Sequence, residues 1–95
     1  MADTYYQGET IKIKATIKDE DGTLTDPTTI TVTIEDPNGT KQVDGATMTK
    51  ESTGVYCYYY TLADDAVTGL WTIEVEASSG YPSIEQDTFR VVSAL

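Results

Sequence analysis

The sequence predicts an all-β fold, a single antiparallel β-sandwich of about seven short strands. Apolar and polar residues alternate with a period of two along most of the chain, which places one type of side chain on each face of a strand. Turn-forming residues interrupt this alternation at intervals of roughly eight to twelve residues, as they do between the strands of sandwiches. The length of 95 residues fits one domain, over residues 1–95, with a modest core.

The first half of the chain alternates most clearly. In Thr10–Lys18, isoleucine and alanine hold the odd positions and lysine and threonine the even ones, so this strand should have one buried and one solvated face. Asp19–Gly22 supplies a turn, and a second alternating strand follows over Thr29–Glu35. Asp36–Gly39 is the strongest turn signal, because its proline presets one φ angle and its Asn-Gly pair tolerates positive φ.

The second half of the chain holds shorter or more aromatic strands. These are expected around Val43, over 46–50, over 55–62 and over 70–77, and around Phe89 and Val91. Ala63–Thr68 could form one helical turn, and it is the only segment whose sequence allows helix. The pattern therefore predicts strands and turns along almost the whole chain.

Composition excludes several classes of chemistry. The chain has no histidine and one cysteine, so a Ser-His-Asp or Cys-His nucleophile, an intrachain disulfide and a cysteine-rich metal site are all excluded. The strand acids fall on solvated faces, which does not favour the paired carboxylates of a glycosidase. We expect no enzymatic activity, no catalytic residue and no cofactor.

Charge and hydropathy restrict the partners and the location. The net charge of −10 disfavours nucleic acid and anionic membranes as partners. No apolar stretch approaches the roughly 20 residues of a membrane span, and no signal peptide is visible at the N-terminus. We expect either cytoplasmic synthesis followed by assembly into a particle, or an extracellular location as part of a larger exported protein.

Five short motifs follow one another in an order that carries a family resemblance. They are Tyr5–Glu9 (Tyr-x-x-Gly-Glu), Asp21-Gly22, Asp36–Gly39, Gly54–Tyr56 and Gly69–Trp71. In this order the chain resembles the Ig-like domains of bacterial and archaeal surface proteins, macroglobulin-type domains, and small accessory proteins of tailed phages and proviruses. The resemblance implies an Ig-like sandwich with Greek-key connections, and it leaves function open because such domains serve as spacers, adhesins and virion parts.

The stretch Glu51–Tyr58 resembles the E–F corner of immunoglobulin domains. The resemblance implies that Tyr56 is the corner tyrosine, whose hydroxyl bonds to backbone upstream. Tyr58 takes the position two residues later, so Cys57 is out of register with the usual cysteine and should point to the opposite face. The resemblance is therefore to disulfide-free Ig-like domains.

The alternation of side chains along each strand assigns some aromatic residues to the core and others to the surface. The expected core aromatics are Tyr56, Tyr58, Trp71 and Phe89. Tyr59 falls on the opposite face of its strand, where with Tyr81 or Tyr5 it would offer a platform for sugar rings or a protein partner.

Acidic residues gather in the loop after the first alternating strand. Asp19, Asp21 and Asp26 are the candidates for a calcium site, because carboxylate oxygens are the ligands that calcium prefers. Their spacing does not match the Ca²⁺-binding loop of EF-hands, and tight turns favour the same residue types. We expect turns here and no metal.

Two functions of different classes remain. The first is a structural or assembly protein, namely an accessory component of a phage or provirus virion, whose partners are other protein subunits. The second is an adhesion or carbohydrate-binding module of a larger secreted protein, with glycan as a partner. Edge strands or an apolar patch would supply the contacts in the first, and Tyr59 and Tyr81 in the second.

Overall fold

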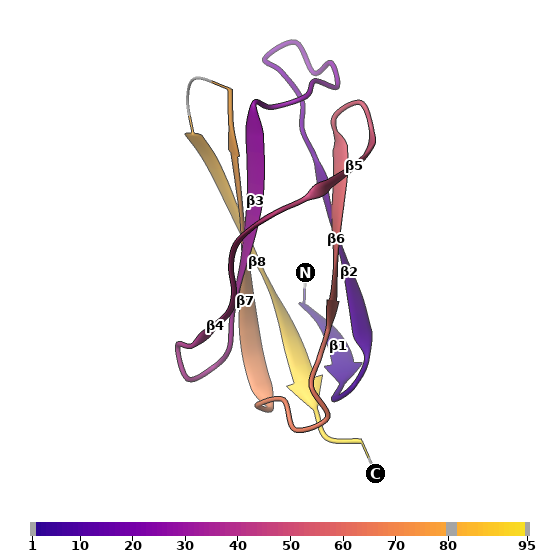
Figure 1. The fold of residues 1–95 in the computed structure, drawn as a ribbon, viewed down its shortest axis with the longest axis vertical. Coiled ribbons are helices and arrows are strands. Elements are labelled where there is room, and N and C mark those ends of the chain that lie inside the picture. The colour runs from indigo at the N-terminus through magenta and orange to yellow at the C-terminus, as the bar shows by residue number, and fades with distance from the viewer. Residues whose placement is uncertain (1, 80–81, 95) are drawn as a thin grey trace.

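In the computed structural model, which describes residues 2–79 and 82–94, the chain folds into two β-sheets packed face to face (Figure 1). The strands of these residues are β1 (Ala2–Tyr6), β2 (Thr10–Thr16), β3 (Thr29–Glu35), β4 (Lys41–Thr47), β5 (Thr49–Ser52), β6 (Val55–Thr61), β7 (Gly69–Ser78) and β8 (Pro82–Val92). One sheet has the order β1-β8-β7-β3-β4 and the other the order β2-β6-β5. This arrangement confirms the predicted all-β sandwich. The described part of the chain contains no helix long and apolar enough to cross a membrane.

The two long sides of the sandwich are closed differently. On one side the chain passes from β4 in the larger sheet directly to β5 in the smaller sheet (Figure 1). On the other side, β2 is the edge of the smaller sheet, and β1 pairs in parallel with β8 only from Thr88 to Val92. The other neighbouring strands are antiparallel. β1 therefore borders less than half of β8.

Sequence alternation decides which residues enter the space between the sheets. Ile11 and Ile13 of β2 are buried while the lysines between and after them are exposed. Val32 and Ile34 of β3 have no exposed surface. The odd residues of β2 and the even residues of β3 thus face one another across the core, as the period of two predicts.

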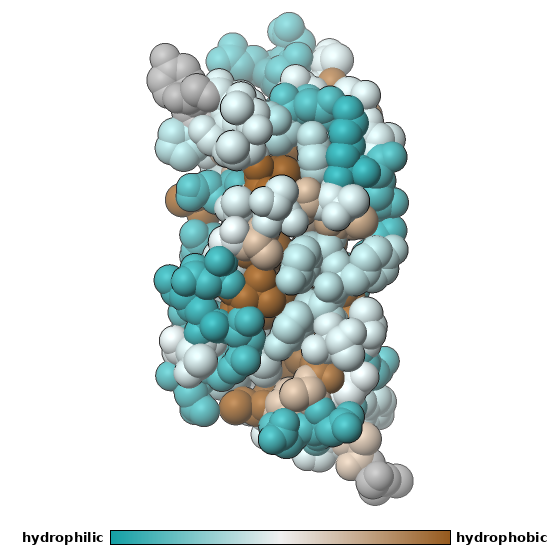
Figure 2. Space-filling model, viewed as in Figure 1, coloured by the Kyte–Doolittle hydropathy of each residue, from teal (hydrophilic) through white to brown (hydrophobic). Residues whose placement is uncertain are grey.

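Trp71 lies within this core. Its ring stacks on Phe89 with the centroids 5.7 Å apart, and Tyr60 lies tilted against it at 6.3 Å. The indole Nε1 donates a hydrogen bond of 2.7 Å to the carbonyl oxygen of Val67, so its buried N–H has a partner. Hydrophobic side chains are visible between the layers in Figure 2, with hydrophilic ones on both sides.

The turn between β3 and β4 forms where the sequence predicts it. Asp36 is 6% exposed, and its Oδ1 accepts hydrogen bonds of 2.9 Å from the backbone N–H groups of Asn38 and Thr40. The hydrogen bond from Thr40 is the main cause that lowers the pKa of the Asp36 carboxyl. Gly39 has a φ of 85°, which explains why this position of the turn favours glycine.

Two elements differ from the expectation. Ala63–Thr68 forms no helix: the N–H of Ala66 donates to the carbonyl of Ala63 at 3.1 Å, and the chain then continues extended into β7. A segment this short cannot offset the cost of nucleating a helix, and burial of Leu62 and Ala66 holds it over the end of the core instead. The segment Ala2–Tyr6 forms β1, which its own sequence pattern did not reveal because only pairing with β8 extends it.

Candidate functional site

The outer face of the smaller sheet carries one large exposed aromatic ring. Tyr59 lies on β6 and points away from the core, with 60% of its surface exposed. Lys12 of β2 is its direct neighbour in the register, and Lys12 Nζ lies 5.7 Å from the centroid of the Tyr59 ring. Glu51 of β5 forms an ion pair with the same amine, with Oε1 3.1 Å from Nζ. We call these three residues, Tyr59, Lys12 and Glu51, the Tyr59 face.

Lys12 and Glu51 each stabilise the ionised form of the other. The hydrogen bond to Glu51 raises the pKa of the Lys12 amine, and the same contact lowers the pKa of the Glu51 carboxyl. Both groups are therefore charged across the neutral range. The ion pair is solvent-exposed, so it orients the Lys12 amine beside the ring rather than contributing much to stability.

Cys57 lies two residues before Tyr59 on the same strand, yet it is 4% exposed. Burial, together with the negative charge of Glu51, raises the pKa of its thiol. Lys14 is its register neighbour on β2 and opposes this shift only in part. The thiol is thus protonated at neutral pH and shielded, which does not suit a nucleophile.

The other residues proposed for the aromatic platform do not join Tyr59. Tyr5 is half-buried on β1, where it meets Phe89 edge-on with ring centroids 5.8 Å apart. It therefore packs against the core, whereas Tyr59 faces outward. Tyr81 lies outside the described residues. Sequence reasoning missed Lys12, which only the strand register places beside the ring, and Glu51, which reaches the Lys12 amine from the irregular part of β5.

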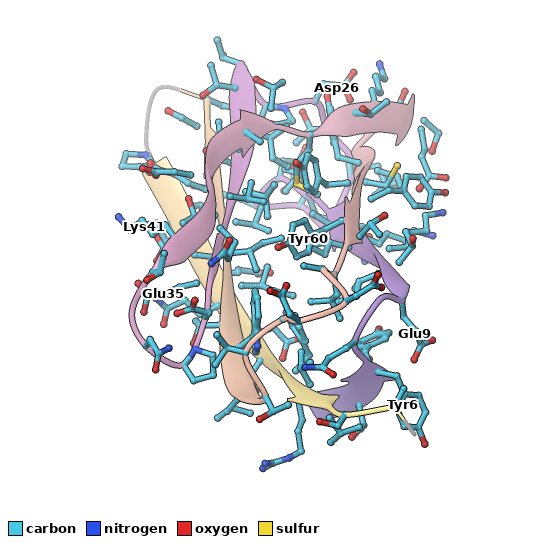
Figure 3. All side chains as sticks on the ribbon, turned by 60° about the horizontal axis from the view of Figure 1, so that its bottom comes forward. Tyr6, Glu9, Asp26, Glu35, Lys41 and Tyr60 are labelled. Carbon is cyan, nitrogen blue, oxygen red and sulfur yellow. The ribbon has the colours of Figure 1, made fainter. Side chains whose placement is uncertain are left out.

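The aromatic residues assigned to the core lie between the sheets. Tyr56, Trp71 and Phe89 are buried, and Tyr58 is half-buried beside them. Tyr60 also points between the layers (Figure 3). These side chains form the scaffold that holds β6, and with it Tyr59, in place.

The corner contact expected of Tyr56 has a different partner. Its hydroxyl donates to Oδ1 of Asp26 at 3.2 Å, not to upstream backbone. The same carboxylate oxygen accepts the N–H of Gly54 at 2.9 Å, and Lys50 Nζ lies 2.6 Å from Oδ2. A side chain replaces the backbone acceptor here because Asp26 reaches the corner from the loop between β2 and β3, which sequence spacing alone does not indicate.

The acidic loop forms a turn. Oδ1 of Asp19 accepts the N–H groups of Asp21 and Thr23 at 2.9 and 3.0 Å, so this carboxylate caps the loop. The Asp26 carboxylate accepts hydrogen bonds from Lys50 and from the N–H of Gly54 instead. Within residues 2–79 and 82–94, no group of three or more acidic or cysteine side chains is placed to hold a metal ion.

Comparison with known proteins identifies the fold independently. The family model of the MG2 domain matches residues 3–91. A search of the curated proteins finds no significant match.

Two crystal structures are similar over nearly the whole chain. The Lin-41 filamin domain has a TM-score of 0.68 at 18% identity, covering 95% of this chain and 83% of that one. A DUF4785 family protein of Legionella pneumophila has a TM-score of 0.75 at 20% identity, covering 97% of this chain and 26% of that one. This chain thus spans about a quarter of the length of the Legionella protein. At these identities the likeness shows the fold alone, an Ig-like sandwich, as the motif order implied.

Because the family model extends over almost all of a sandwich with this topology, the chain belongs to the MG2 domain family, an Ig-like domain of the macroglobulin type with a structural or interaction role.

Proposed function

We propose that this domain is a non-enzymatic component that joins other protein subunits in a larger assembly through the Tyr59 face. The observation that carries the proposal is the Tyr59 ring, 60% exposed on a strand that is paired on both sides. Tyrosine suits a protein interface because it offers a large, rigid contact area and a hydrogen-bonding hydroxyl. Lys12 beside the ring and Glu51, its ion-pair partner, add one charge of each sign.

The side-chain chemistry supports a role without catalysis. The sequence contains no histidine, and its one thiol, that of Cys57, is buried with a raised pKa. Asp26 and Asp36, whose carboxyl pKa values are lowered, are both occupied by hydrogen bonds that hold turns and a corner. A general acid would need a raised carboxyl pKa in a cleft.

We favour an accessory component of a phage or provirus virion as the setting. The support is the order of the five sequence motifs, which resembles small accessory proteins of tailed phages and proviruses. Cytoplasmic synthesis followed by assembly is then the expected route. A second setting is a surface module of a longer protein, with a glycan as its ligand. The Legionella neighbour, in which the similar region is 26% of a longer chain, supports the modular part of this setting.

Site-specific photo-crosslinking distinguishes these settings. A photoreactive phenylalanine analogue at position 59 is introduced in the native host, with the same analogue at Glu76, which is exposed on the outer face of β7, as the matched control. Virion subunits crosslinked from position 59 and not from position 76 support the assembly role. Glycan-array binding that Tyr59→Ala removes, without protein crosslinks, supports the surface module. Equal crosslinking from both positions contradicts a specific Tyr59 face.

A further inference from the structure

The side of the sandwich opposite β4 and β5 contains a groove that β1 fills only in part. Two hollows of about 420 and 550 Å³ share Ala15, Val75 and Glu85, so they form one continuous groove between β2 and the β7–β8 hairpin. β1 lies beside the end of β8 that leads to the C-terminus (Figure 1). Within residues 2–79 and 82–94, no strand pairs with Pro82–Gln86 on the side away from β7.

The groove therefore has an open strand edge. Pro82–Gln86 belongs to an eleven-residue strand whose other half, Thr88–Val92, is bordered by the five-residue β1. Backbone N–H and C=O groups at such an edge are ready to pair with a further strand. β1 demonstrates the geometry: it lies in line with the vacant edge, and its Tyr5 packs inward on Phe89.

The floor of the groove is apolar. Ile13 and Ala15 come from β2, and Ile73 and Val75 come from β7. Ile13 is buried, and the other three are half-buried at the margin of the core. An added strand would cover these side chains and extend the hydrophobic core along β8.

The wall formed by β8 is acidic. Phe89 and Val91 point into the core, and by the period of two Glu85 lies on the same face of the strand, where it lines both hollows. An inward-facing charge on an edge strand disfavours pairing with a neutral or acidic strand. The net charge of −10 likewise opposes association of two copies of this chain. Lys12, Lys14 and Lys18 also line the hollows, but acidic residues outnumber them there, so the groove as a whole selects a basic partner.

We propose that this groove binds an extended basic segment of another protein, which adds a strand to the Pro82–Gln86 edge of β8 and directs a lysine or arginine side chain at Glu85. The apolar floor would receive alternate aliphatic side chains of the same segment. This site lies between the sheets on the open side of the sandwich, apart from the outward-facing Tyr59. It shares Lys12 with the Tyr59 face, because Lys12 also lines one of the hollows. Glu85 and the Pro82–Gln86 edge belong to the groove alone, so the groove can be tested separately from the Tyr59 face.

A designed peptide tests the proposal. The probe is acetyl-Thr-Val-Thr-Lys-Thr-Val-Thr-amide, whose Val and Lys residues share one face of a strand, and the control peptide has Glu in place of Lys. The whole chain, labelled with ¹⁵N, is titrated with each peptide and followed by NMR and by amide hydrogen exchange. We expect the Lys peptide to bind at least ~10-fold more tightly than the Glu peptide. Shift changes should be confined to β2, β7 and β8, and slowed exchange to amides of Ser83–Gln86 and their neighbours, because Pro82 has no amide hydrogen.

Charge-reversed variants give the matched control. Glu85→Lys reverses the charge that lines both hollows, and Glu76→Lys makes the same change in net charge on the outer face of β7. Glu85 and Glu76 are both exposed, so both variants should fold. We expect Glu85→Lys to lower the affinity for the Lys peptide at least ~10-fold, and Glu76→Lys to change that affinity less than ~2-fold. Equal losses in the two variants, equal affinity for the two peptides, absence of binding at millimolar peptide, or self-association through this edge in sedimentation each overturn the proposal.

Discussion

The hydroxyl of Tyr56 donates a hydrogen bond to Oδ1 of Asp26, and this contact joins residues 30 positions apart in the sequence. Asp26 lies in the loop between β2 and β3, where the chain crosses from one sheet to the other, and Tyr56 lies near the start of β6. Through Gly54 and Lys50 the same carboxylate also holds the β5–β6 turn and β5. Asp26, labelled in Figure 3, thus ties three segments together at one end of the sandwich.

Removing the Tyr56 hydroxyl should weaken this end of the fold. Tyr56→Phe keeps the buried ring and deletes one hydrogen bond to a charged acceptor, so we expect the Tm to fall by roughly 5 °C. Differential scanning calorimetry at pH 7 measures it. Tyr6→Phe is the control, because that ring is 54% exposed, and it should leave the Tm almost unchanged. Equal Tm values for the two variants would contradict a structural role for the Tyr56 hydroxyl.

Stability should depend on pH through Asp26. The hydrogen bond from Lys50, followed by that from Gly54, lowers the pKa of the Asp26 carboxyl. A carboxyl whose pKa is lower in the folded state stabilises the fold fully above its unfolded pKa of about 3.9, and this contribution is lost as the pH falls through the folded pKa. The Tm difference between the wild type and Asp26→Asn should therefore be largest near neutral pH and shrink below about pH 4. A difference that stays constant down to pH 2 would be inconsistent with this titration.

The stability of the β3–β4 turn should depend on the acceptor oxygens of the Asp36 side chain. Oδ1 accepts two backbone hydrogen bonds, and Oδ2 accepts one from Nε2 of Gln42 at 3.1 Å. Asp36→Asn keeps one carbonyl acceptor, whereas Asp36→Ala leaves the N–H groups of Asn38 and Thr40 without theirs. We expect the alanine variant to lose roughly 5–10 °C in Tm and the asparagine variant less. Thermal melts followed by circular dichroism compare them, and equal losses would contradict the argument.

Local sequence pattern was sufficient to predict most strands. Alternation predicted β2 and β3 because one face of each is buried and the other solvated, and the Asp-Pro-Asn-Gly turn followed from backbone preferences alone. The same parity placed Tyr59 on the outer face of β6. These features depend on neighbours in the sequence.

Features that depend on pairing between distant strands were not predictable. β1 extends only because β8 pairs with it, and Tyr5 is consequently turned toward Phe89 rather than toward a partner. The corner acceptor Asp26 and the neighbours of Tyr59 are likewise set by sheet order and register. One sequence fixes the parity of a strand, but it does not say which strand lies beside it.

Cys57 should react slowly in the folded protein. Its thiol is buried, and its pKa is raised, so little thiolate is present or accessible at pH 8. We expect labelling by a disulfide reagent such as DTNB to be at least ~100-fold slower in buffer than in concentrated guanidinium. Comparable rates in the two conditions would show that the strand face over Cys57 is open.

Tyr59→Ala should separate binding from folding. The ring is 60% exposed, so its removal should change the free energy of unfolding by no more than about 0.5 kcal/mol. The affinity for a partner identified by crosslinking at position 59 should nevertheless fall at least ~10-fold, because exposed tyrosines at the centre of interfaces contribute strongly. Tyr6→Ala, also an exposed tyrosine but on β1, is the control and should leave that affinity unchanged. A large loss of stability in Tyr59→Ala would place the ring in the core instead, and an unchanged affinity would exclude the Tyr59 face as the contact.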